Sequence, residues 1–125
     1  MSTIANPKMN VPSSDVLQIL HEIDSRFSPK IRPYSVVLVT LSNSNQILSS
    51  DIIYTGKLEH QLSVKKLILN IALRHQAEQL LVVQYRSEPI KQLTPIDIAF
   101  AQSLKEICGC VDINVLDFII RERRC

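Results

Sequence analysis

QLLVVQY, residues 79–85, is a short and nearly continuous apolar run. A strand with one solvent-exposed face alternates apolar with polar residues, whereas a strand that is buried on both faces is apolar throughout. The run is therefore predicted to be a central strand of a sheet. A structure in which it is helical, or lies at a sheet edge, would contradict this prediction.

The segments on either side of this run have helical periodicity. Within residues 63–74 the apolar positions fall on one face and the lysines, asparagine and arginine on the other, which predicts a helix packed on the sheet. After a loop at 86–93, Thr94-Pro95-Ile96-Asp97 combines a capping residue, a proline at the first helical position and a carboxylate at the third. This is a capping box, and it predicts a helix that runs to about Cys110.

Four further segments complete the predicted fold. Residues 13–27 form an amphipathic helix, YSVVLVTL (34–41) and 46–54 form a hairpin that ends near Gly56, and 115–120 is the last strand. The order α-β-β-α-β-α-β predicts a single α+β domain of the α/β/α-like kind, with a mixed central sheet and helices packed on it.

The chain has the length of one domain, 125 residues. The polar residues 1–12, which include two prolines, are expected to be a disordered lead. We expect the domain itself to span 13–120 and to be followed by a charged C-terminal tail, residues 121–125.

Composition excludes several classes of function. A net charge of +2 does not indicate a nucleic-acid-binding protein, and two glycines, Gly56 and Gly109, cannot form a glycine-rich phosphate loop. No run approaches the roughly 18 apolar residues of a membrane helix. Three cysteines without a CxxC pair argue against a disulfide framework, so a reducing cytoplasm is expected.

Metal ligands are sparse in this sequence. His21, His60 and His75 are far apart and match no ligand motif, so they predict no zinc site. Cys108 and Cys110 are close in sequence, but the third thiol, Cys125, lies in the tail. Two small residues at a helix end are the simpler interpretation of that pair, and a redox or metal role for the three thiols stays open.

Taken together, Gly56-x-Leu58, the helix 64–74, LLVVQYR, TPIDI and VLDFII resemble the JAB/MPN metalloprotease-fold domain of the RadC family, from about Asp15 to Ile120. In that family the central strand ends in His-x-His-Pro-Ser-Gly, and a metal-binding Asp follows the second His by eleven residues. The resemblance puts Gln84 and Arg86 at the two histidine positions and Asp97 at the aspartate position. The motif serine falls on Glu88, and the general-base glutamate falls on Pro33 or, with one inserted residue, on Arg32.

These substitutions imply an inactive relative. A guanidinium has no lone pair for a metal, so Arg86 is expected to pair with Asp97 in the metal's place and to lower the pKa of that carboxyl. We expect no catalytic residues, no metal at Gln84, Arg86 and Asp97, and no cofactor.

The leading hypothesis is a catalytically inactive RadC/JAB-like domain that acts as a protein-binding or scaffold module, with a protein partner or as a homo-oligomer and without a membrane or nucleic acid. One alternative is a divergent hydrolase that uses Asp97 with Glu88 or Cys110. Another is a small accessory protein of DNA repair or metabolism, which would use the tail arginines Arg121, Arg123 and Arg124.

Overall fold

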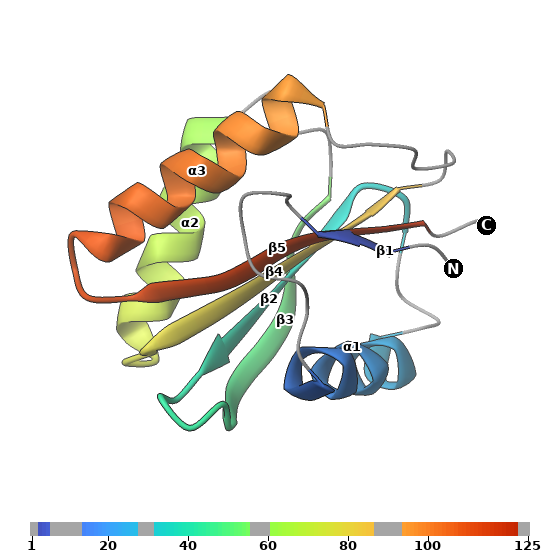
Figure 1. Cartoon of the computed structure of the whole chain (residues 1–125), viewed down its shortest axis with the longest axis horizontal. Coiled ribbons are helices and arrows are strands. Elements are labelled where there is room, and N and C mark those ends of the chain that lie inside the picture. Colours follow the sequence, from blue (N-terminus) through green and yellow to red (C-terminus); the bar gives the residue numbers. More distant parts are fainter. Residues whose placement is uncertain (1–2, 6–13, 28–31, 56–60, 87–93, 123–125) are drawn as a thin grey trace.

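The computed structural model describes residues 3–5, 14–27, 32–55, 61–86 and 94–122. The predicted elements occur in the predicted order α-β-β-α-β-α-β (Figure 1). They are α1 (Ser14–Phe27), β2 (Ser35–Leu41), β3 (Ile47–Thr55), α2 (Gln61–Arg74), β4 (Gln79–Arg86), α3 (Pro95–Gly109) and β5 (Asn114–Glu122). Gly56, where the hairpin was expected to end, lies outside the described residues.

The strands, with a short strand β1 at Thr3–Ala5, form one mixed sheet in the order β1-β5-β4-β2-β3. Strand β4 pairs with β5 in parallel and with β2 antiparallel, so it lies in the interior of the sheet. Its residues from Leu80 to Tyr85 are all buried. The prediction that 79–85 is a central strand is confirmed.

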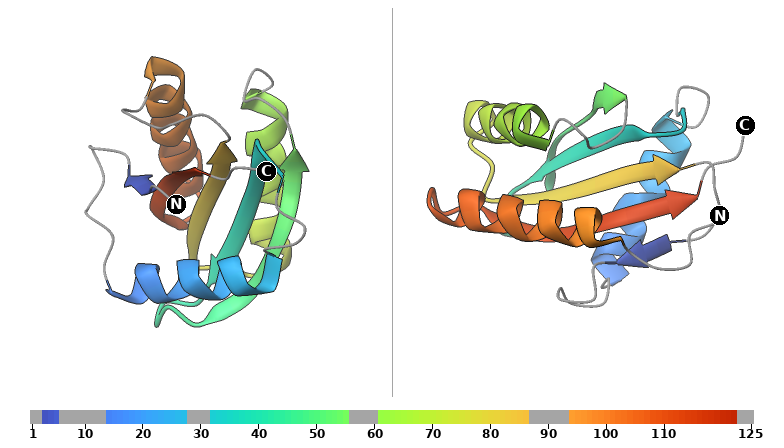
Figure 2. Two further views of the ribbon diagram at one scale, coloured as in Figure 1. Left: turned by 90° about the vertical axis from the view of Figure 1, so that its right-hand side faces the viewer. Right: turned by 90° about the horizontal axis from the view of Figure 1, so that it is seen from above.

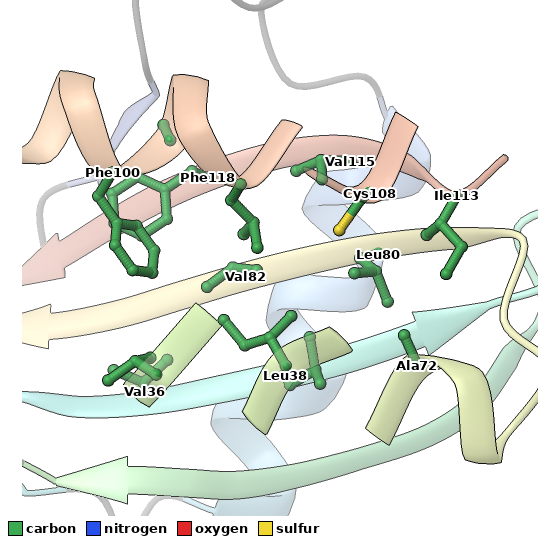
Figure 3. Packing of buried hydrophobic residues seen from close by; sticks show 14 of the residues in the cluster. Val36, Leu38, Ala72, Leu80, Val82, Phe100, Cys108, Ile113, Val115 and Phe118 are labelled. Atoms are coloured by element: carbon green, nitrogen blue, oxygen red, sulfur yellow. The ribbon is translucent and has the colours of Figure 1, made fainter. Parts of the chain in front are cut away.

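The sheet is covered on both faces, by α2 and α3 on one side and by α1 on the other (Figure 2). Alternate residues of β4 divide between the two cores: Leu80 and Val82 pack with α2 and α3, whereas Leu81 and Val83 pack with α1. This two-sided burial explains why the run in β4 is apolar at every position. Figure 3 shows the first core, in which the rings of Phe100 and Phe118 lie 5.4 Å apart.

The structure corrects the predicted ends of the domain. Thr3–Ala5, in the expected disordered lead, forms a short strand β1 that pairs with β5, with Ile4 opposite Ile120. It supplies backbone partners along the outer edge of β5. At the other terminus β5 includes Arg121 and Glu122, expected in the tail, because β4 continues to Arg86 and pairs with them.

Candidate functional site

The candidate site forms where β4 ends beside the first turn of α3. Side chains on a strand alternate between its two faces, so Gln84 and Arg86 continue the row of Leu80 and Val82 on the side of α3. The chain then returns through residues 87–93, which are not described, to the start of α3. Asp97 lies in that first turn, within hydrogen-bonding distance of Arg86.

The guanidinium of Arg86 links Asp97 to Gln84. Its Nη1 donates to Asp97 Oδ2 at 3.1 Å and its Nη2 donates to Asp97 Oδ1, which makes a bidentate ion pair. Its Nε and Nη2 also donate to Gln84 Oε1, at 3.1 and 2.7 Å. The side chain of Arg86 is 15% exposed and that of Asp97 only 1%, so the pair is largely shielded from solvent. The pairing expected from the sequence is present.

Asp97 also completes the capping box predicted from the sequence. Its Oδ2 accepts the backbone N–H of Thr94 at 3.0 Å, and its own N–H donates to the Thr94 hydroxyl at 3.2 Å. Burial alone would raise the pKa of this carboxyl, but the hydrogen bonds from Arg86 and Thr94 and the charge of Arg86 together hold the pKa below its ordinary value. Asp97 is therefore a carboxylate fixed by both a cation and a helix end.

Among Gln84, Arg86 and Asp97, Gln84 has a buried donor without a hydrogen-bond acceptor among the described residues. It is fully buried, its oxygen accepts from Arg86, and its Nε2 has no partner among the described residues. A buried donor without an acceptor costs about 1–3 kcal/mol. The oxygen of Gln84 thus accepts from the guanidinium of Arg86, and its Nε2 has no acceptor among the described residues.

These residues do not fit a zinc ion. Zinc takes ligands with a free lone pair in a tetrahedral set, and a guanidinium has none. The oxygens of Gln84 and Asp97 already accept hydrogen bonds from Arg86. Across the part of the chain that the structure describes, no group of three His, Cys, Asp or Glu side chains could hold a metal.

The residues expected at the general-base position lie at the same end of the sheet. Arg32 and Pro33 lie ahead of β2, separated from it by the single residue Tyr34, whose N–H donates to Tyr85 O at 2.5 Å. The start of β2 is thereby fixed beside the end of β4. Glu88, at the motif serine position, lies outside the described residues.

The thiols and imidazoles do not join this site. Cys110 is exposed just beyond the far end of α3, thirteen positions from Asp97, which is about 20 Å along a helix. The alternative that pairs Asp97 with Cys110 is therefore wrong. Cys108 is buried, which raises the pKa of its thiol to about 11.

The four remaining residues raised as ligands are His21, His75, His60 and Cys125. His21, on α1, and His75, just after α2, are exposed and belong to opposite sides of the sheet. His60 and Cys125 lie outside the described residues.

Sequence reasoning missed a second polar cluster on the opposite face of β4. Tyr85 donates its hydroxyl to Asp24 Oδ1 of α1 at 3.0 Å, and Arg121 of β5 pairs with Asp24 Oδ2 at 2.9 Å. The strand alternation that puts Gln84 and Arg86 toward α3 requires Tyr85 to point toward α1, so the signal was present in the sequence. Asp24 anchors α1 to the ends of β4 and β5.

Asp117 of β5 was also missed as a perturbed group. It is 1% exposed, and its side chain accepts the backbone N–H of Phe118 at 2.8 Å. Burial raises the pKa of this carboxyl to about 6, although the bond from Phe118 opposes the shift. It lies beside the irregularity between Leu80 and Leu81 in the pairing of β4 with β5.

The comparison with protein families confirms the resemblance predicted from the sequence. The profile of the RadC-like JAB domain matches residues 12–125. The chain belongs to the RadC-like JAB domain family. This RadC-like JAB domain is 25% identical over 103 residues to a UPF0758 protein of Streptococcus uberis, a match that covers 82% of this chain and 43% of the relative.

A UPF0758 protein of Streptococcus suis is similar to the same degree, 25% over 103 residues, with 82% of this chain and 40% of the relative covered. The domain thus spans less than half the length of these curated relatives. None of its described helices has both the length and the apolar composition needed to cross a membrane.

Proposed function

We propose that this RadC-like JAB domain is catalytically inactive and acts as a protein-binding or scaffold module. The observation that carries the proposal is the bidentate contact of Arg86 with Asp97, with Gln84 as a further acceptor. By the family resemblance these are the three metal-ligand positions. A permanent cation therefore occupies the place of the metal, and the site is degenerate.

Loss of the metal would remove the chemistry of this fold. A catalytic zinc polarises a carbonyl and lowers the pKa of its bound water to about 7. Arg86 supplies a positive charge without a coordination position, and it is neutralised by Asp97. At the general-base position neither Pro33 nor Arg32 can accept a proton from water. Both halves of the hydrolytic mechanism are missing.

The binding half of the proposal rests on exposed apolar side chains. Leu62 and Leu73, both on α2, are each more than half exposed. Large apolar residues on the surface favour contacts with another protein when they cluster. We propose a cytoplasmic domain with a protein partner or a second copy, and without a resident cofactor.

Neither alternative has an observation that favours it. The hydrolase hypothesis with Cys110 fails on distance, and Glu88 lies outside the described residues. A role in DNA metabolism rests on the family and the tail arginines, of which Arg121 is engaged with Asp24.

Metal analysis tests the inactive half directly. Protein purified without added metal is expected to contain far less than one zinc per chain, before and after incubation with zinc and dialysis. It is also expected not to cleave a panel of fluorogenic peptide amides. Stoichiometric zinc that is lost on Asp97→Ala would contradict the proposal.

A variant with histidines at positions 84 and 86, where the family resemblance places the metal-binding histidines, provides a second test. The double substitution Gln84→His and Arg86→His is expected to destabilise the domain, because Asp97 loses its counter-charge, and not to restore hydrolysis, because the general base is still missing. Cleavage of any peptide amide by this variant would contradict the assignment of the general-base position.

A further inference from the structure

Helix α2 carries apolar side chains on more of its surface than the core uses. Val64, Ile68 and Ala72, spaced four residues apart, are buried against the sheet. Leu62 and Leu73 are 61% and 52% exposed. A helix on the surface of a monomeric protein normally has a polar outer side, so these leucines indicate contact with something else.

Leu62 and Leu73 belong to a regular row along α2 that also contains Leu69, which is partly buried against the core; Leu67, 37% exposed, lies outside this row. Leu62, Lys66, Leu69 and Leu73 are spaced by four, three and four residues, so they lie on one side of the helix. Residues with this spacing line the contact between two packed helices. We call these four residues the α2 seam. Its spacing favours a helix as the occupant.

Charge on α2 is of one sign. The helix contains Lys65, Lys66 and Arg74 and no acidic residue. Lys65 donates to the hydroxyl of Ser103 on α3, at 2.8 Å. Lys66 and Arg74 are exposed, and neither forms an ion pair with any described residue. Unpaired cations beside exposed leucines complement a partner that carries carboxylates.

We propose that the α2 seam binds an amphipathic helix of a partner protein, with an apolar row that packs on the leucines and acidic residues on its flanks. The inference rests on the proposed function, which gives the domain a protein partner. A second copy docked through α2 is disfavoured, because it would bring three basic residues of each helix together without a carboxylate on either. Figure 2 shows that α2 lies on the outside of the sheet, where a partner helix can approach it.

Two synthetic helices test this surface with the intact chain. Both carry leucines at the four-three-four spacing, one with glutamates and one with lysines on both flanks. We expect the glutamate helix to bind in a fluorescence anisotropy titration, about tenfold or more tighter than the lysine helix, with binding that weakens as salt is added. Lys66→Glu is expected to reduce this preference, because Lys65 and Arg74 remain on the helix.

Serine substitutions locate the contact. Leu73→Ser and Leu62→Ser should each weaken binding of the glutamate helix about fivefold or more. Leu17→Ser is the matched control: Leu17 is 57% exposed, but on α1, on the opposite side of the sheet, and binding should be unchanged. All three positions are exposed, so the variants should unfold at the wild-type temperature.

Several results would overturn the inference. These are equal binding of the two helices, no binding of either, or no effect of Leu73→Ser and Leu62→Ser. A wild-type dimer in sedimentation that Leu73→Ser converts to a monomer would assign the seam to a second copy instead. Stoichiometric zinc in the protein would contradict the proposed catalytic inactivity without affecting the measured binding of the synthetic helices. A zinc-free protein that binds neither helix would contradict the docking surface on α2 without affecting the proposed inactivity.

Discussion

Replacing Arg86 tests the link between β4 and α3. Arg86→Ala removes the guanidinium that donates to Asp97 and Gln84, and it leaves a carboxylate that is 1% exposed without its counter-charge. Removal of one partner of a buried ion pair costs about 3–5 kcal/mol. Arg86 is 15% exposed and water can enter the vacated space, so we expect the lower end, about 3 kcal/mol of unfolding free energy.

A double-mutant cycle separates the pair from its surroundings. Asp97→Asn keeps an oxygen that can accept from Thr94 and should cost about 2 kcal/mol. The double variant leaves no unpaired charge and should cost about 3 kcal/mol rather than the sum of about 5, a coupling of about 2 kcal/mol. Urea unfolding at pH 7 measures all four proteins. Effects that add to within about 0.5 kcal/mol would show that the two residues do not interact, and the proposed degenerate site would be wrong.

A second ion pair provides a control for this cycle, and the lowered pKa of Asp97 predicts how the stability depends on pH. Asp24 and Arg121 form a more exposed pair, 25% and 14%, and their coupling should be below about 1 kcal/mol. The pKa of Asp97 is lowered from 3.8 in the folded state, so its stabilising effect is present above that pH and is lost as the pH falls through the lowered pKa. The advantage of wild type over Asp97→Asn should therefore shrink below about pH 4.

Three further measurements follow from Asp117, Cys108 and Tyr85. Asp117 has a folded pKa of about 6 against an ordinary 3.8, so the wild type should become more stable as the pH falls from about 6 toward 4. Asp117→Asn should be more stable than wild type at pH 8, by up to about 3 kcal/mol, and should lose this advantage below pH 4. A stability difference between the two proteins that does not change with pH would contradict the raised pKa. In a Cys125→Ser background, Cys110 should react with a maleimide far faster than Cys108, whose thiol is buried with a pKa of about 11, and equal rates would contradict the burial of Cys108. Tyr85→Phe should cost about 1 kcal/mol, because the hydroxyl donates to α1, and no change would make that bond energetically neutral.

The strands and helices were predictable because each has a strong local pattern. The apolar run of β4 can be buried on both faces only in the interior of a sheet, and the capping box of Thr94 and Asp97 fixes the start of α3 wherever the helix packs. The short strand Thr3–Ala5 was missed because three residues have no detectable period. Its pairing with β5 depends on where the rest of the sheet ends, which is a tertiary fact.

The candidate site was predictable through the resemblance to the RadC family, which implies that Arg86 and Asp97 lie side by side, and the contact itself is present. The environment of Asp117 could not be derived, because burial of a carboxyl within a strand pattern depends on how β5 pairs with β4 around the irregularity at Leu81. The lack of a hydrogen-bond acceptor for Gln84 Nε2 among the described residues could not be predicted from the sequence either, since it depends on which side chains surround this nitrogen.

Two neighbouring side chains at the end of β4 contact helices on opposite faces of the sheet. Tyr85 reaches Asp24 of α1, and its neighbour Arg86 reaches Asp97 of α3. By the family resemblance, a metal would join the last residues of β4 to the first turn of α3, and in this chain the ion pair makes that join. A chain that loses the two histidines without gaining Arg86 would leave Asp97 as a buried, uncompensated carboxylate beside the strand, which is strongly destabilising. Arg86 therefore explains how the fold can keep the contact between β4 and α3 after the proposed loss of the metal. We expect its substitution to lower the stability of the contact between β4 and α3.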